Sequence, residues 1–375
     1  MERIKSKKFI KLISIGLIIA MILVIGTLYE KNETVKNFFD KYVFMKKVKE
    51  EKIPSIPIDS SDIFAYQDKI LIWKDNNITV YNKYGKEEYK LDIELVNPIF
   101  NASSKYFCIA EKEGQKIYVV SGRNIIWQNS LEGKIEDVKI NDNGYLAVTI
   151  LGTTDKSVVT VYDNRGKELF SKHIAEDYVV DADISKDNEY LAIAKVNYAG
   201  IDIQSSIEII PIVQAARGIY EINEYKSKLG DLILNVKYHS KNLLSCIYNN
   251  HSAIINGTEV KEIDDFENDN VMFADLNNKI VEIVKEKKNA LIPTVNVKII
   301  DNEAEDAKKY ETEEPKQIYV YGDIIAINLG SEAIFINNNG WLLKEYKSSQ
   351  EIHDIIITND IAAIIYKNKI GIIPL

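Results

Sequence analysis

Histidine and cysteine side chains are the first candidates for nucleophilic or metal-binding chemistry in this chain of 375 residues. The four histidines are His173, His239, His251 and His353, and none has a cysteine or a second histidine at the spacing of a zinc site. We therefore predict that they are solvated or lie at strand ends. His353 and the following Asp354 are predicted in an innermost strand, where they would face a central channel, but one such pair does not make a site.

The two cysteines, Cys108 and Cys246, lie in apolar segments that read as strands of separate repeat units. This environment predicts buried thiols that pack as small hydrophobic groups. A disulfide would be permitted outside the cell, but nothing in the spacing requires one.

Carboxylates are the next candidates. Residues 264–270 alternate oxygen ligands as a calcium loop does, but lack the glycine and the closing glutamate of an EF-hand, so we predict a solvated loop. The Asn-Asp-Asn-Gly run at 141–144 is interpreted as turn chemistry. Asp181 and Asp183 share one face of a predicted strand, which alone does not make an acid–base pair.

Three tryptophans occupy strand or turn positions typical of packing between blades, with a sugar-stacking platform as the alternative: Trp73, Trp127 and Trp341. The serine-hydrolase elbow, the phosphate-binding glycine loop and the histidine–glutamate zinc helix are absent from the sequence. We therefore predict no catalytic, cofactor-binding or metal-binding residues, no cofactor and no enzymatic activity.

Composition and charge narrow the class of protein. With 46% hydrophobic and 27% charged residues and two cysteines, the chain is neither disordered nor a disulfide scaffold. The net charge is −9, and because residues 1–11 carry +4, the remainder carries −13. Such an acidic body predicts that the protein does not bind nucleic acid.

A charge-free apolar run at residues 12–29 follows the basic tail of residues 1–11. As a helix it would extend about 27 Å, close to the hydrocarbon thickness of a bilayer. The run is long for a signal peptide and has a poor cleavage site, so we predict an uncleaved transmembrane helix rather than a cleaved signal or a buried core helix. The dense cations before it favour a cytoplasmic amino terminus and an extracytoplasmic body at the cell membrane, although lysines also follow the run.

Residues 30–52 are rich in lysine and glutamate and predict a helical stalk or linker. Their apolar residues have the spacing of a short amphipathic helix: Val35, Phe38, Phe39 and Tyr42. This helix would pack on the body or, alternatively, lie on the membrane surface. Pro54 and Pro57 then favour extended chain.

From residue 53 onward the sequence consists of short β-branched strands separated by repeated turns. One hairpin pattern places Asn or Asp after a strand and glycine three residues later, and it occurs at 82–85, 163–166 and 337–340. A second hairpin, at 140–147, recurs at 184–192.

Together these patterns give units whose first strands begin near residues 62, 97, 135, 178, 232, 271, 316 and 351. Four-stranded units of roughly 40–45 residues indicate an all-β fold, a β-propeller over 53–375. We predict eight blades, with seven as the alternative count and a pair of β-sandwiches as the rival fold. The last unit has only three strands, and residues 53–58 would supply the fourth, so that the amino- and carboxyl-terminal strands close the ring.

The turn-glycine hairpins and the Asn-Asp-Asn-Gly-Tyr-Leu-Ala segment at 141–147 resemble the YVTN/WD40-like propeller superfamily over about residues 53–375. With the basic tail and the single apolar span, the chain is similar to an uncharacterised family of membrane-anchored propellers from low-GC Gram-positive bacteria. The Trp-Asp and Gly-His signatures of true WD40 repeats and the repeated glycine–tryptophan pattern of quinone-binding propellers are absent. The resemblance implies no activity and no functional residues.

We therefore expect a non-enzymatic scaffold that is anchored in the lipid bilayer by its amino-terminal helix and binds an envelope protein. The alternative is a sensor or enzyme that takes a glycan or small ligand in the central channel. The sequence leaves the oligomeric state open.

Overall fold

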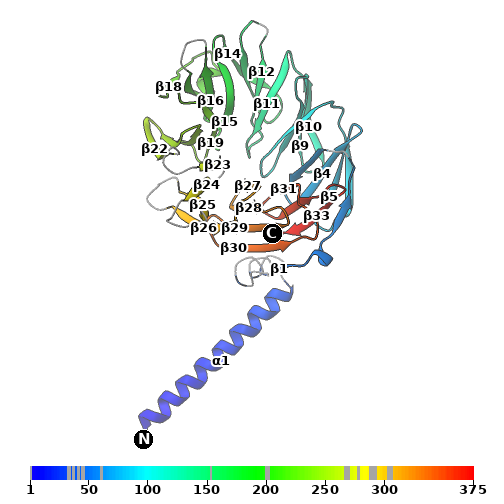
Figure 1. The fold of residues 1–375 in the computed structure, drawn as a ribbon, viewed down its shortest axis with the longest axis vertical. Helices are drawn as coiled ribbons and strands as arrows, with labels where there is room; N and C mark the ends of the chain where they lie inside the picture. The colour runs from blue at the N-terminus through cyan, green and yellow to red at the C-terminus, as the bar shows by residue number, and fades with distance from the viewer. Residues whose placement is uncertain are drawn as a thin grey trace.

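Alternating apolar and polar residues, punctuated by Asn, Asp and Gly turns, form the strands of this chain. The computed structural model describes residues 2–31, 35, 39, 43, 47–59, 62–152, 154–198, 203–265, 271–276, 279–286, 294–301 and 307–375. Seven four-stranded sheets and one five-stranded sheet are arranged as the blades of a ring, with a helix extending from it (Figure 1).

Apart from the amino-terminal strands β1 and β2, the strands of each blade follow one another in chain order, and neighbouring strands are antiparallel. Blade 1 contains β3 (Asp62–Tyr66), β4 (Lys69–Lys74), β5 (Asn77–Asn82) and β6 (Glu87–Asp92). Blade 2 contains β7 (Pro98–Ala102), β8 (Phe107–Glu111), β9 (Lys116–Ser121) and β10 (Asn124–Ser130). Blade 3 contains β11 (Lys134–Ile140), β12 (Leu146–Leu151), β13 (Ser157–Tyr162) and β14 (Glu168–Ile174). Blade 4 contains β15 (Tyr178–Ile184), β16 (Tyr190–Asn197), β17 (Gln204–Pro211) and β18 (Asn223–Lys226).

The second half of the chain repeats this arrangement. Blade 5 contains β19 (Ile233–Tyr238), β20 (Leu243–Tyr248), β21 (His251–Asn256) and β22 (Glu259–Asp265). Blade 6 contains β23 (Val271–Leu276), β24 (Ile280–Glu286), β25 (Thr294–Ile300) and β26 (Lys308–Thr312). Blade 7 contains β27 (Gln317–Tyr321), β28 (Ile324–Asn328), β29 (Glu332–Asn337) and β30 (Leu342–Lys347). Blade 8 contains β31 (Asp354–Ile357), β32 (Ile361–Ile365), β33 (Lys369–Pro374) and, from the amino-terminal side, β2 (Ser55–Pro57).

The eight-bladed propeller predicted from the turn repeats is confirmed, and each first strand begins within three residues of its predicted start. The predicted closure is confirmed as well. β2 pairs antiparallel with β33, with Ile56 opposite Ile370, and the Ile56 side chain is buried between blades 8 and 1. Because β2 is an outer strand, Pro57 can occupy it without breaking an interior ladder.

The predicted stalk is helical at its described amino-terminal positions and differs from the prediction at its carboxyl-terminal end. α1 (Glu2–Lys31) reaches into this segment, and Val35 and Phe39 are helical. Phe38 and Tyr42 lie outside the described residues, and residues 47–52 do not form an α-helix. β1 (Lys47–Val48) pairs in parallel with β30 and adds a fifth strand to blade 7, and a 3-10 helix, η1 (Glu50–Lys52), follows. Since β30 would otherwise leave its backbone groups unpaired at a sheet edge, a short extended segment is stabilised there.

Among the described residues, two α-helices are continuous. α1 (Glu2–Lys31) precedes the ring, and the one-turn α3 (Ile212–Ala215) lies between β17 and β18. Among the helices of the described residues, none combines the length and the apolar character needed to cross a membrane.

The ring has two faces, each formed by a different set of loops. The mouth face carries the loops between first and second strands and between third and fourth strands, such as 103–106 and 163–167. The linker face carries the loops between second and third strands and the connections between blades, such as 75–76 and 227–232. Apolar side chains fill the spaces between blades, since each large buried cluster combines residues of two neighbouring blades.

Candidate functional site

The structure separates the four histidines and gives each a local role. His173 is exposed, and its Nδ1 lies 2.8 Å from Oδ2 of Asp155. His251 stacks on a neighbouring tyrosine ring. His353 precedes β31 rather than lying in it, and it lines a hollow of about 350 Å³ near Lys316 and Glu351. Within the described part of the chain, no group of three His, Cys, Asp or Glu residues is arranged to hold a metal ion.

His239 has an unusual environment. Both ring nitrogens are buried and lack a hydrogen-bond partner within the described residues. Burial, together with the positive charges of Lys237 and Lys186, lowers the pKa of His239 to about 4. The imidazole is therefore neutral at physiological pH.

Both cysteines are buried free thiols, as predicted. Cys108 lies in β8 and Cys246 in β20, in blades 2 and 5. Burial raises the pKa of both thiols well above the ordinary value. Since the thiolate is the reactive form, neither cysteine is suited to nucleophilic chemistry in the folded protein.

The tryptophans do not share one role. Trp127 packs in the core between blades 2 and 3 against the Tyr162 ring, with 5.7 Å between ring centroids. Trp73 packs against the core between blades 1 and 2. Trp341 lies in a turn and is 61% exposed, so the prediction that it packs between blades is wrong. The turn fixes the backbone position of this residue, because the Trp341 amide donates a hydrogen bond to Oδ1 of Asn337 at 3.0 Å.

Asp181 and Asp183 connect the first strands of blades 4 and 5. The Val236 amide donates to Asp181 at 3.0 Å, and the Tyr238 amide donates to Asp183 at 2.7 Å. Lys139 of blade 3 also contacts Asp181, with 2.9 Å between Nζ and Oδ1. Burial raises the pKa of Asp183 to about 6. The pair thus joins blades rather than forming an acid–base site.

The two loops that resembled metal sites are accounted for differently. Residues 266–270 of the acidic run lie outside the described residues, and 264–265 end β22. In the 141–144 turn, Oδ1 of Asn141 accepts the amides of Asn143 and Tyr145 at 3.0 and 3.1 Å. Gly144 has a φ of +79°, as a turn glycine requires. The prediction of turn chemistry is confirmed.

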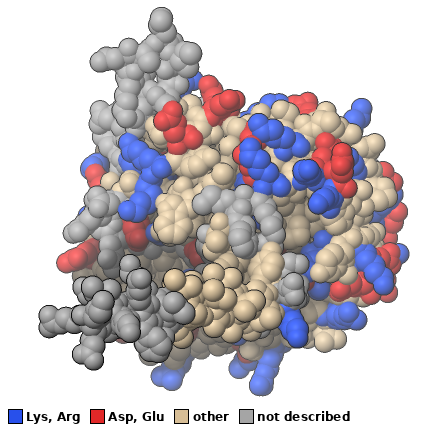
Figure 2. All heavy atoms as spheres, turned by 90° about the horizontal axis from the view of Figure 1, so that it is seen from below, with Lys and Arg blue, Asp and Glu red and all other residues tan. Residues whose placement is uncertain are grey.

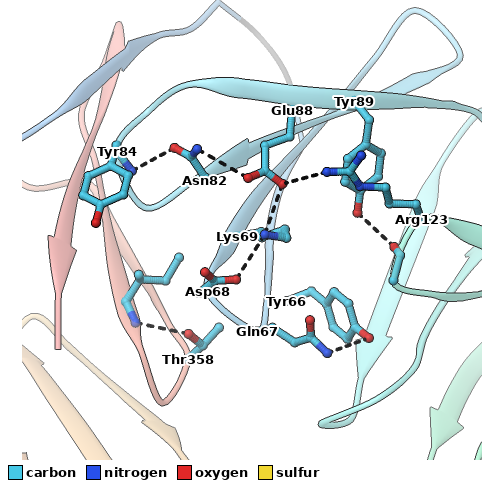
Figure 3. Close-up of polar contacts among 12 residues, drawn as sticks. Tyr66, Gln67, Asp68, Lys69, Asn82, Tyr84, Glu88, Tyr89, Arg123 and Thr358 are labelled. Atoms are coloured by element: carbon cyan, nitrogen blue, oxygen red, sulfur yellow. Dashed lines mark hydrogen bonds and ion pairs between the residues drawn. The ribbon is translucent and has the colours of Figure 1, made fainter. Parts of the chain in front are cut away.

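A charged cluster covers blades 1 and 2 on the mouth face (Figure 3). Nζ of Lys69 lies 3.2 Å from both Asp68 and Glu88, and Arg123 lies 3.8 Å from Glu88. The Arg123 guanidinium also lies over the Tyr89 ring, 4.9 Å from its centroid. Two cations and two carboxylates balance one another, so this cluster joins the blades and leaves no charge in excess for a ligand.

The centre of the ring holds a cavity of about 680 Å³ that reaches the mouth face. Seven blades contribute to its wall, and Phe64 and Phe100 form a stacked pair there with centroids 4.6 Å apart. The polar and charged lining comprises Asn101, Ser103, Ser104, Lys139, Asn141, Asp142, Asp183, Lys186, Asn235, Lys237, Tyr238, Tyr321 and Asn359. Lys186 and Lys237 were not singled out from the sequence, because no motif marks a lysine that faces a channel.

The linker face of blades 3 to 5 carries an exposed apolar group that we call the linker-face patch: Tyr178, Tyr198, Ile203 and Leu229. The two tyrosine rings are stacked, with centroids 4.8 Å apart and planes 13° apart, and Nζ of Lys156 lies over both. The Gly230 amide donates to the Ile203 carbonyl at 2.8 Å and holds the two loops together. The sequence did not mark Tyr198 as part of a surface.

Charge is mixed on the side of the molecule seen in Figure 2, where the described basic and acidic side chains are interspersed. That side presents no broad surface of a single sign among the described residues.

The comparisons with known proteins identify a family and a fold. The model of a family of unknown function, DUF5711, matches residues 36–375. No curated protein matches the sequence significantly. BamB from Moraxella catarrhalis is similar in structure, with a TM-score of 0.52, 10% identity, and coverage of 88% of this chain and 99% of that one. The WD40 domain of SCAP from fission yeast has a TM-score of 0.50, 10% identity, and coverage of 88% and 96%. At such identities these likenesses concern the fold alone.

Proposed function

The chain belongs to DUF5711, a family of unknown function, and we propose that it is a membrane-anchored, extracytoplasmic scaffold that binds a protein partner of the cell envelope. The observation that carries this proposal is the linker-face patch. In this scheme the propeller holds the patch on a rigid ring and acts by binding rather than by catalysis.

The patch has the composition of a protein-binding surface. Tyr198 is 51% exposed and Leu229 is 64% exposed, although an aromatic and an aliphatic side chain of this size are more stable when buried. Exposed apolar groups that cluster, and tyrosines above all, are typical of the centres of protein interfaces. The stack with Tyr178 fixes the Tyr198 ring in place, which reduces the entropy lost on binding.

The position of the patch leaves it accessible. The amino-terminal strands β1 and β2 join blades 7 and 8, whereas the patch lies on blades 3 to 5, across the ring from them (Figure 1). A chain tethered through its amino terminus would therefore hold the patch away from the point of attachment.

The membrane anchor is proposed from the sequence of residues 12–29, which contains no charged side chain and follows a basic tail. This arrangement supports a cytoplasmic amino terminus and an extracytoplasmic propeller. Protease added to intact cells or spheroplasts should then digest the propeller, and complete protection would contradict the topology.

The interaction is tested by photocrosslinking in cells that express the full-length chain. A benzoylphenylalanine at position 198 should give a discrete adduct with an envelope protein. The same probe at Tyr84, which is 66% exposed on the mouth face of blade 1, should not give that adduct. Equal adducts at both positions, or no adduct at position 198, would refute the proposal.

A matched pair of substitutions separates binding from folding. Leu229→Ser should abolish the adduct formed from position 198. Val96→Ser, at an apolar residue that is 83% exposed between blades 1 and 2, should leave it unchanged. Loss of the adduct in both variants would indicate a general effect of surface polarity and not a specific surface.

A further inference from the structure

In the central cavity, the principal hydrogen-bond acceptors are bound to partners within the protein, whereas several hydrogen-bond donors are not. Its volume of about 680 Å³ is in the range of sites that hold small organic ligands, roughly 300–1,000 Å³. Its location and its residues are distinct from those of the linker-face patch, so a ligand in the cavity is independent of the proposed protein interaction.

The carboxylates of the lining are already engaged. Asp183 accepts the Tyr238 amide at 2.7 Å. Asp142 accepts both the amide and the hydroxyl of Ser104 at 2.7 Å. Behind them, Asp181 accepts the Val236 amide of blade 5 and forms an ion pair with Lys139 of blade 3. The principal acceptors near the cavity therefore point to partners within the protein.

Several donors of the lining have no such partner. The side chains of Lys186, Lys237, Asn235, Asn359 and Tyr321 line the cavity and form no hydrogen bond or ion pair within the described part of the chain. Two of these groups are ammonium ions, two are amides and one is a phenol, so their free capacity is weighted toward donation. Lys139, the third lysine, is neutralised by Asp181 at 2.9 Å.

The two unpaired lysines act on the same region. Both lower the pKa of His239, in addition to the effect of burial, so both ammonium groups lie within electrostatic range of that imidazole. They come from neighbouring blades, since Lys186 follows β15 in blade 4 and Lys237 lies in β19 of blade 5. The positive charges of these two lysines, one from each blade, would attract an anion to the seam between the blades.

We propose that the cavity binds a small oxyanion, a phosphate or carboxylate group carried by an organic molecule, with Lys186 and Lys237 as its principal ligands. Oxyanions provide only acceptors, which is what the free donors of the lining require. The amides of Asn235 and Asn359 and the Tyr321 hydroxyl would bind the remaining oxygens, and the stacked Phe64 and Phe100 would contact the organic part.

The test is titration of the detergent-solubilised full-length protein with inorganic pyrophosphate and, separately, with citrate, by isothermal calorimetry. The wild type should bind at least one of the two at concentrations below about 10 mM, and the one it binds distinguishes a phosphate site from a carboxylate site. The double variant Lys186→Gln, Lys237→Gln should bind at least about tenfold more weakly, because each charge-assisted hydrogen bond is strong in a partly enclosed site.

A second double variant controls for net charge. Lys86→Gln, Lys167→Gln removes two exposed lysines from turns of the same face, outside the cavity lining, and should bind as the wild type does. Absence of binding by the wild type, or equal weakening in the two double variants, would overturn the proposal. Because the charge of Lys237 favours the ionised form of Asp183, the Lys186→Gln, Lys237→Gln variant should melt somewhat below the wild type, and a cooperative transition well above the titration temperature confirms that the comparison concerns folded protein.

Discussion

The effect of Asp183 ionisation on stability measures how the seam between blades 4 and 5 buries this carboxyl group. It accepts the Tyr238 amide across the seam, and burial raises its pKa from an ordinary value of 3.8 to about 6. The positive charge of Lys237 opposes this rise, and the negative charge of Asp181 adds to it. Asp183→Asn retains an oxygen for the Tyr238 amide and removes only the ability to ionise.

Proton linkage gives the sign and the size of the effect of Asp183 ionisation on the free energy of unfolding. Because the pKa is raised on folding, the native protein holds this proton more tightly than the unfolded chain does. Ionisation of Asp183 therefore lowers stability, with no effect below about pH 3.8 and the full effect above about pH 6. The difference between the two pKa values corresponds to about 3 kcal/mol at about 1.4 kcal/mol per pKa unit. Relative to the wild type, Asp183→Asn should therefore gain about 3 kcal/mol over the whole range, of which about 2 kcal/mol falls between about pH 4.5 and about pH 8.

The assay is urea unfolding of the full-length protein in detergent, followed by tryptophan fluorescence at about pH 4.5 and about pH 8. Asp163→Asn, a substitution in an exposed turn of blade 3, controls for the exchange of oxygen for nitrogen. If the stability difference between Asp183→Asn and the wild type is the same at both pH values, the carboxyl is not buried in the manner described and the reasoning is refuted.

Three further predictions concern the ring. Ile56→Ala should lower the free energy of unfolding by about 2–5 kcal/mol in urea, because Ile56 is buried where β2 closes the ring. Gly166→Ala should lower the melting temperature, since Gly166 has a φ of +78° and an added Cβ would lie 2.7 Å from the Trp127 ring; an unchanged melting temperature would contradict this packing. Cys108 and Cys246 should react with a maleimide only after unfolding, as mass spectrometry would show; labelling of the native protein would contradict their burial.

The architecture was predictable because the repeat is local. Each turn needs Asn or Asp to accept nearby amides and glycine to adopt a positive φ, and both requirements are visible within six residues, as at 163–166. The closing strand was predictable for a related reason, since the last unit lacked one strand and residues 53–58 were unpaired. In contrast, β1 forms because it pairs with β30 at the edge of blade 7, and no local sequence pattern predicts this pairing.

The cavity and the patch were not predictable, because each joins residues from separate blades. Lys186 and Lys237 are ordinary lysines in the sequence, and only the ring brings both to one channel. Likewise, nothing in the residues around Tyr178 indicates that Tyr198 will stack on it. For Trp341 the prediction of burial was wrong, because the residue type suggested packing between blades whereas its position in a turn leaves the side chain exposed.

The fold and the proposed oxyanion site have a common physical origin. The first strand of each blade is a sheet edge, so the amides on its free side need acceptors from outside the sheet. At the seams near the cavity, short polar side chains meet that need: Asn101 accepts the Ile140 amide at 2.9 Å, and Asp181 and Asp183 accept two amides of β19. Lys139 still forms an ion pair with Asp181, but Lys186 and Lys237 form none within the described part of the chain. The unmatched donors of the cavity are thus a consequence of how the blades are joined, and an anion that binds them would stabilise the same seam.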